Sequence, residues 1–110
     1  MPGSYEVLLT AGAESDLESI HDFVLTQDGT HRADYLLNSV LRTIEDLSEF
    51  PERGSYPKEL LDVGIKTYRQ TFFKPYRVIY QVIGHRVIVS LIADGRRDMQ
   101  SILSSRLLRR

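Results

Sequence analysis

The chain has 110 residues, a net charge of −1, 42% hydrophobic residues, 26% charged residues and no cysteine. This length predicts a single domain over residues 1–110, and the composition is ordinary for a globular protein. The absence of cysteine excludes a disulfide framework, a thiolate metal site and a cysteine nucleophile. The N-terminus has no signal-peptide pattern, and no apolar run approaches the roughly 20 residues of a membrane span. We therefore expect a cytoplasmic protein without membrane contact.

The small net charge conceals an asymmetry between the two halves of the chain. Residues 1–55 carry three arginines against eleven acidic residues, a net charge of −8. Residues 56–110 carry eleven Lys and Arg against four acidic residues, a net charge of +7. A basic half of this kind indicates an anionic partner, either nucleic acid or an acidic protein segment. Mutual neutralisation of the two halves within the fold explains the split equally well.

The first two predicted elements are a strand and a helix. Residues 5–10, YEVLLT, are rich in strand formers and alternate loosely. Thr10 is a suitable N-cap for the helix that follows. The apolar stripe of this helix consists of Ala13, Leu17, Ile20 and Val24. Asp28-Gly29 ends the helix, because glycine readily adopts positive φ.

A second, longer helix is predicted from Thr30, its expected N-cap, to Phe50-Pro51, where proline ends it. Its apolar positions keep helical spacing over about four turns. They are Ala33, Leu36, Leu37, Val40, Leu41, Ile44 and Leu47. The two helices form an antiparallel hairpin that needs a large apolar partner. Residues 51–64 read as a loop, in which Leu60-Leu61 either forms a helical turn or pins the loop to the core.

Three strands follow between Ile65 and Ala93. The first carries Lys66 and Arg69, and the turns Lys74-Pro75 and Gly84-His85 separate it from strands over 76–83 and 86–93. Both faces of the second hairpin are largely apolar, so we expect it at the centre of a sheet covered on both sides.

The turn lengths also predict the strand register. A two-residue turn at Gly84-His85 predicts three cross-strand pairs: Val82 with Val87, Tyr80 with Val89, and Val78 with Leu91. A two-residue turn at Lys74-Pro75 places Arg69 opposite Tyr80, whereas a three-residue turn changes that register.

The tail after Asp98 reads as a C-terminal helix with Asp98 as its N-cap. Ile102, Leu103 and Leu107 are its candidate docking residues, and Arg106, Arg109 and Arg110 are expected to stay exposed. The topology is then β-α-α-β-β-β-α. The predicted fold is an α+β two-layer sandwich, with a helical hairpin packed on a mostly antiparallel sheet.

Arginine and tyrosine are the candidates for chemistry. The sequence has no glycine-rich phosphate loop, no metal-ligand spacing and no nucleophile motif, so no metal and no cofactor is expected. Four arginines and three tyrosines fall on or beside the predicted strands: Arg69, Arg77, Arg96, Arg97, Tyr68, Tyr76 and Tyr80. They form either a surface for nucleic acid or acidic peptide, or a core in which Arg77 pairs with Asp94 or Asp98.

The sequence resembles the RelE/ParE toxins of type II toxin–antitoxin modules from Tyr5 to Leu108. The most specific matching segments are Tyr68-Arg69, then 74–80 (KPYRVIY), and finally 95–98 (GRRD). The resemblance implies the same fold and two alternative activities. RelE-like members cleave mRNA in the ribosome, whereas ParE-like members inhibit DNA gyrase without being nucleases.

The missing late acid or base favours the ParE-like activity. RelE-like enzymes combine basic residues on the sheet with a Tyr or His near the C-terminus, and no Tyr or His follows His85 here. We therefore expect a gyrase inhibitor rather than an enzyme. The expected target-binding residues are Arg69, Arg77, Arg96, Arg97 and Arg106. In the alternative mRNA endonuclease, Arg69, Arg77, Arg96, Arg97 and Tyr76 would be the catalytic residues.

The resemblance also implies partners. A cognate antitoxin would wrap an acidic, amphipathic segment around the sheet and the C-terminal region, and operator DNA would be reached only through that complex. A third hypothesis is an inactive homologue that binds its antitoxin and nothing else.

Overall fold

A computed structural model describes residues 4–108 of the chain. Its elements are β1 (Glu6–Leu9), α1 (Ala11–Asp28), α2 (Thr30–Glu45), a 3₁₀ turn (Asp46–Ser48), α3 (Lys58–Leu61), β2 (Arg69–Phe73), β3 (Tyr76–Ile83), β4 (Arg86–Asp94) and α4 (Met99–Leu107). The order confirms the predicted topology. Of the two alternatives for Leu60-Leu61, the helical turn is present as α3, and Leu60 is also fully buried. None of the helices in residues 4–108 is long and apolar enough to cross a membrane.

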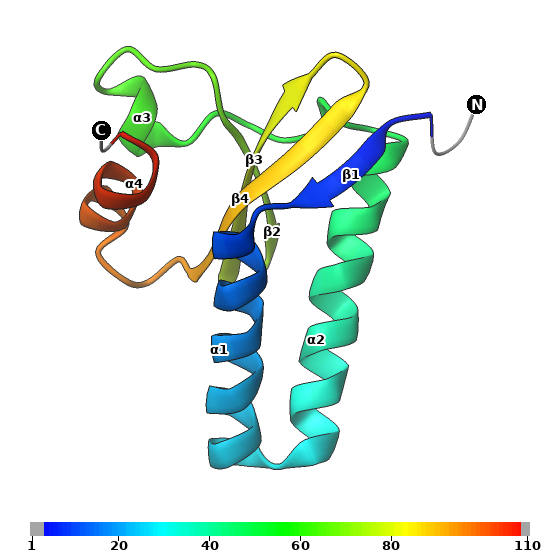
Figure 1. The fold of residues 1–110 in the computed structure, drawn as a ribbon. Coiled ribbons are helices and arrows are strands. Elements are labelled where there is room, and N and C mark those ends of the chain that lie inside the picture. The colour runs from blue at the N-terminus through cyan, green and yellow to red at the C-terminus, as the bar shows by residue number, and fades with distance from the viewer. Residues whose placement is uncertain (1–3, 109–110) are drawn as a thin grey trace.

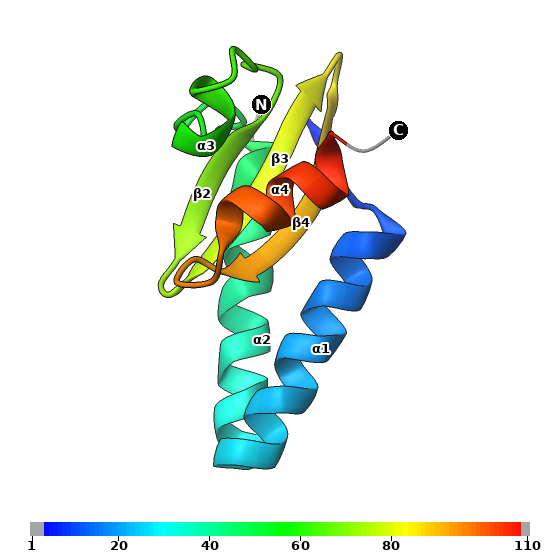
Figure 2. The same cartoon turned by 90° about the vertical axis from the view of Figure 1, so that its left-hand side faces the viewer.

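The four strands form one sheet in the order β1-β4-β3-β2. Only the β1–β4 pair is parallel, and the two other pairs are antiparallel. Figure 1 shows the α1–α2 hairpin along one face of the sheet, and Figure 2 shows α4 lying across the opposite face. The predicted α+β fold and the central position of the β3–β4 hairpin are both confirmed.

Each face of the sheet has its own apolar core. On the hairpin side, Tyr80 and Val89 pack with the stripes of α1 and α2, and both are fully buried. On the other side, Leu91 packs with Leu60 of α3 and Leu103 of α4. Burial of these large apolar side chains is the main force that holds the helices on the sheet.

Local signals fixed the helix ends only in part. The Thr10 hydroxyl accepts the Ala13 N–H at 3.1 Å, as predicted for an N-cap, and Gly29 ends α1 at φ +91°. The prediction that Thr30 caps the second helix is wrong, because Gly29 occupies the N-cap and Thr30 is the first helical residue. That helix also ends at Glu45, and the 3₁₀ turn rather than α-helix leads toward Pro51.

A β-bulge corrects the predicted register. The pairs Val82–Val87 and Tyr80–Val89 are present, and Arg69 lies opposite Tyr80, as the two-residue turn predicts. Val78, however, pairs with Ile92 rather than Leu91, because β4 has one extra residue between Val89 and Leu91. The bulge turns Leu91 toward α4 and Ile92 toward the helical hairpin.

The C-terminal helix begins as predicted. The Asp98 carboxylate accepts the Ser101 N–H at 3.2 Å, which satisfies one of the unpaired donors of the first helical turn. Leu103 is fully buried, and Ile102 and Leu107 are partly buried beside it. The predictions for Arg109 and Arg110 lie outside the described residues.

Candidate functional site

Arg77 is a buried cation with its own carboxylate. Its guanidinium donates to both carboxylate oxygens of Glu59, at 2.8 and 2.9 Å, and its Nε donates to Gln70 Oε1 at 2.9 Å. The predicted pairing with Asp94 or Asp98 is therefore wrong. The hydrogen bond from Arg77 lowers the pKa of Glu59 against the opposing effect of burial, so the pair is ionised at neutral pH.

The Arg77 stem also supports the loop that leaves β4. A Cβ added at Gly95 would lie 2.8 Å from Arg77 Cδ and 3.0 Å from Cγ, so a glycine is needed for the loop to cross this side chain. The Gly95 N–H donates to the Pro75 carbonyl at 2.8 Å. Residues 95–98, GRRD, are thus held against the β2–β3 turn, and we call them the exit loop.

Arg69 holds the loop before α3. Its guanidinium donates to the Gly54 carbonyl at 2.9 Å and to the Tyr56 hydroxyl at 3.2 Å. It also lies 4.7 Å from the Tyr56 ring centroid, within cation–π range. Tyr80, fully buried, donates from its hydroxyl to the Pro51 carbonyl at 2.7 Å and accepts the Gly54 N–H at 3.2 Å. Arg69 and Tyr80 therefore hold the same loop, around Pro51 and Gly54, against the sheet.

The exit loop presents two exposed arginines of the predicted site, Arg96 and Arg97. Arg96 donates to both carboxylate oxygens of Asp94, at 3.0 and 2.6 Å, while its side chain is 78% exposed. These bonds lower the pKa of Asp94. Arg97 is exposed and has no salt bridge to a residue of the described chain. Tyr76 is half-buried beside them; burial, and next Asp94, raise the pKa of its hydroxyl, which therefore stays protonated at neutral pH.

Arg106 is exposed as predicted but already has a partner. It donates to both carboxylate oxygens of Asp16 in α1, at 2.9 and 3.2 Å, and to the Ser90 carbonyl at 3.1 Å. Asp16 also accepts the Ile92 N–H at 3.0 Å. The backbone groups at the β4 bulge are thus satisfied by side chains from α1 and α4, which ties three elements together.

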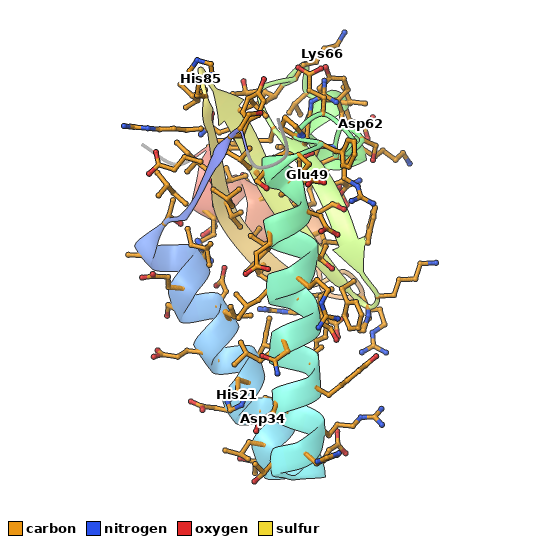
Figure 3. All side chains as sticks on the ribbon, turned by 90° about the vertical axis from the view of Figure 1, so that its right-hand side faces the viewer. His21, Asp34, Glu49, Asp62, Lys66 and His85 are labelled. Atoms are coloured by element: carbon orange, nitrogen blue, oxygen red, sulfur yellow. The ribbon has the colours of Figure 1, made fainter. Side chains whose placement is uncertain are left out.

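The histidines do not gather with these residues. His21 and Asp34 face each other across the helical hairpin at 3.0 Å, and His85 lies at the opposite end of the molecule (Figure 3). Within residues 4–108, no cluster of His, Asp and Glu side chains is arranged to hold a metal ion. The exit loop therefore offers arginines that can bind an anion, whereas the His21–Asp34 contact lies on the helical hairpin.

Several residues of this region escaped the sequence analysis. Glu59 and Gln70, which bind Arg77, and Asp16, which binds Arg106, lie 18, 7 and 90 positions from their partners. Glu59 directly precedes Leu60-Leu61, which were expected to form a helical turn or to pin the loop to the core. That position was the one signal in the sequence that Glu59 lies close to the sheet.

Comparison with known proteins identifies the class. The family described as "ParE toxin of type II toxin-antitoxin system, parDE" matches residues 7–99. Toxin ParE3 of Caulobacter vibrioides is 28% identical over 100 residues, which are 91% of this chain and 96% of that protein.

Two solved structures share the fold. One, from the chromosomal ParDE toxin–antitoxin system of P. aeruginosa, has a TM-score of 0.69 at 16% identity and covers 84% of this chain and 97% of its own. The other, from the toxin–antitoxin complex RelBE2 of Mycobacterium tuberculosis, has a TM-score of 0.59 at 21% identity and covers 83% and 91%.

The helical hairpin on a mostly antiparallel sheet is thus a fold that this chain shares with chains of these two toxin–antitoxin systems. The family match over residues 7–99 goes further and shows that the chain belongs to the ParE toxin family of type II toxin–antitoxin systems.

Proposed function

We propose that this toxin arrests growth by inhibiting DNA gyrase and that a cognate antitoxin neutralises it. Family membership supports the toxin class. The observation that disfavours mRNA cleavage is the state of Arg77, which is buried and bound to Glu59 and Gln70. The same contacts remove Arg77 from the expected target-binding residues, so the proposed surface rests on the exposed arginines.

Cleavage of RNA requires a group that takes the 2′-hydroxyl proton, cations on the phosphate, and a group that protonates the leaving oxygen. Arg77 and Arg69 both serve internal contacts, and the raised pKa of the Tyr76 hydroxyl disfavours it as the base that takes the 2′-hydroxyl proton. No Tyr or His follows His85 in the sequence. A target that is bound rather than cleaved needs only the exposed surface, and Arg96 and Arg97 supply it.

Supercoiling by purified gyrase tests this proposal directly. We expect the toxin to reduce conversion of relaxed plasmid to supercoiled plasmid in a dose-dependent manner. Arg96→Ala with Arg97→Ala should relieve both this inhibition and growth arrest, because these side chains supply the proposed binding surface. The double variant should still fold, since neither side chain has a buried contact that folding requires. Unchanged supercoiling with new mRNA 5′ ends after induction would point to the endonuclease. Normal growth without antitoxin would point to an inactive homologue.

The antitoxin is the second proposed partner. The ParDE and RelBE2 structures come from toxin–antitoxin systems, and the basic C-terminal half of this chain suits an acidic segment that orders on binding. Co-expression with a cognate antitoxin protein should restore growth and give a stable complex. Two separately eluting proteins and continued growth arrest would refute neutralisation by that protein.

A further inference from the structure

The end of the molecule that holds the exit loop also carries a groove. The α1–α2 hairpin projects well past the end of the sheet, where the β2–β3 turn and the exit loop lie (Figures 1 and 2). Two cavities of about 450 and 440 Å³ occupy this corner. Both are lined by Phe23 and Tyr76, so they are neighbours, and we call the two together the corner groove.

The corner groove has an aromatic lining that the core does not use. Phe23 of α1 and Tyr35 of α2 are 64% and 65% exposed, and Tyr35 meets Phe73 edge to face at 6.4 Å between centroids. Tyr76 completes the set. Exposed aromatic side chains gathered in a concave site are characteristic of protein-binding surfaces, in which a few anchors supply most of the affinity.

The rim of the groove is basic once internal pairs are counted. Asp16 is neutralised by Arg106, and Asp94 by Arg96. Of the remaining charged lining residues, Arg32, Lys74 and Arg97 form no salt bridge within residues 4–108, and neither does Asp28. Three cations against one carboxylate favour an acidic occupant.

We propose that the corner groove is the docking site for an acidic segment of gyrase that inserts an apolar side chain between Phe23, Tyr35 and Tyr76. This inference rests on the proposed function and names the surface that carries it. The groove is continuous with the exit loop, since Arg96 lines one cavity and Arg97 the other. The apolar lining and the Asp28 carboxylate favour a protein segment over a nucleic-acid backbone, which would present phosphate throughout.

The test compares matched variants in the supercoiling assay. Phe23→Ala combined with Tyr35→Ala removes the anchors, and Arg32→Glu alone reverses one rim charge at an exposed helical position that folding does not need. Phe50→Ala and Lys66→Glu are the controls. Phe50 is 60% exposed, and Lys66 lies at the end of the molecule away from the hairpin tip (Figure 3).

We expect each groove variant to need at least about ten times more toxin for half-inhibition, as for loss of one hot-spot contact. The controls should stay within about two-fold of the wild type. Full inhibition by Arg32→Glu and by the double variant would overturn the groove while leaving gyrase as the target. Absence of inhibition by the wild-type toxin would overturn the proposed function, and this docking site with it.

Discussion

Replacing Glu59 with glutamine measures what the buried ion pair contributes to the fold. The substitution keeps the volume of the side chain and one acceptor oxygen but removes the charge opposite Arg77. The Arg77 side chain is 11% exposed and the Glu59 side chain is 24% exposed, and two hydrogen bonds of 2.8 and 2.9 Å join them. Loss of one partner from a fully buried pair costs about 3–5 kcal/mol, because it leaves the other charge uncompensated.

The expected loss here is smaller. Glu59 keeps some contact with water, and both glutamine at position 59 and Gln70 still accept hydrogen bonds from Arg77. We therefore expect Glu59→Gln to lower the free energy of unfolding by about 2 kcal/mol. For a domain of this size, that corresponds to a fall in Tm of roughly 8 °C. Urea unfolding followed by circular dichroism at pH 7 measures the difference.

The dependence on pH gives a second readout. The pKa of Glu59 is lowered from its ordinary value of 4.5 in the folded state, so its stabilisation is fully present above pH 4.5. It is lost as the pH falls through the lower folded-state pKa. The gap between the wild type and Glu59→Gln should therefore narrow in acid.

The matched control is Glu6→Gln, which breaks the exposed 3.3 Å pair with Arg86. Exposed pairs contribute only about 0–1 kcal/mol, so this variant should unfold close to the wild type. Equal losses for Glu59→Gln and Glu6→Gln at pH 7 would refute the argument that burial gives the Arg77 pair its importance.

Three further substitutions test other contacts, each by urea unfolding. Tyr80→Phe leaves the Pro51 carbonyl without its donor inside the protein, which should cost about 1–3 kcal/mol. Gly95→Ala drives a methyl group against the Arg77 stem and should cost about 1–3 kcal/mol. Thr10→Ala removes the N-cap of α1 and should cost about 1 kcal/mol.

For Tyr80→Phe and Thr10→Ala, the chain offers matched control positions, Tyr56 and Thr26. Tyr56→Phe removes a hydroxyl from a residue that is 36% exposed, and Thr26→Ala removes an exposed hydroxyl from the last turn of α1. Both should stay within about 0.5 kcal/mol of the wild type. If Tyr56→Phe cost as much as Tyr80→Phe, burial of the hydroxyl would not be the cause. Wild-type stability of Gly95→Ala would show that the exit loop moves away from Arg77 easily.

The sequence predicts this fold well wherever the determinants are local. The apolar stripe that includes Leu17 and Val24 specifies the buried face of α1. Thr10 and Asp98 cap their helices, as their residue types and their positions before the helices predict. The register near Gly84-His85 also follows from the turn alone. In each case, the residues that decide the structure lie within about one or two turns of one another.

Two of the failures, the β4 bulge and the partner of Arg77, have non-local causes. The bulge in β4 is stabilised by Asp16 and Arg106, which come from opposite ends of the chain, and nothing within β4 itself marks the extra residue. The partner of Arg77 lies in α3, a helix of a single turn, which is too short for a periodicity that would indicate which way Glu59 points. Long-range pairing of polar side chains depends on the completed packing, which a single sequence does not display.

The charge asymmetry that first indicated an anionic partner has two origins. Within the described residues, two salt bridges join the acidic and basic halves, Arg86 with Glu6 and Arg106 with Asp16. Part of the asymmetry is therefore internal neutralisation, as the alternative interpretation held. Arg77 and Arg96 find carboxylates within the basic half.

Among the arginines and lysines of the described C-terminal half, Lys74 and Arg97 are the two that line the corner groove without a salt bridge. Arg32, from the acidic half, lines the same groove. The positive charge available to a partner is therefore set by position in the fold rather than by position in the sequence. A partner that binds all three of these cations contacts α2 as well as the exit loop. Arg32→Glu should therefore weaken binding of a target that occupies the groove but not of a target that contacts Arg96 and Arg97 alone.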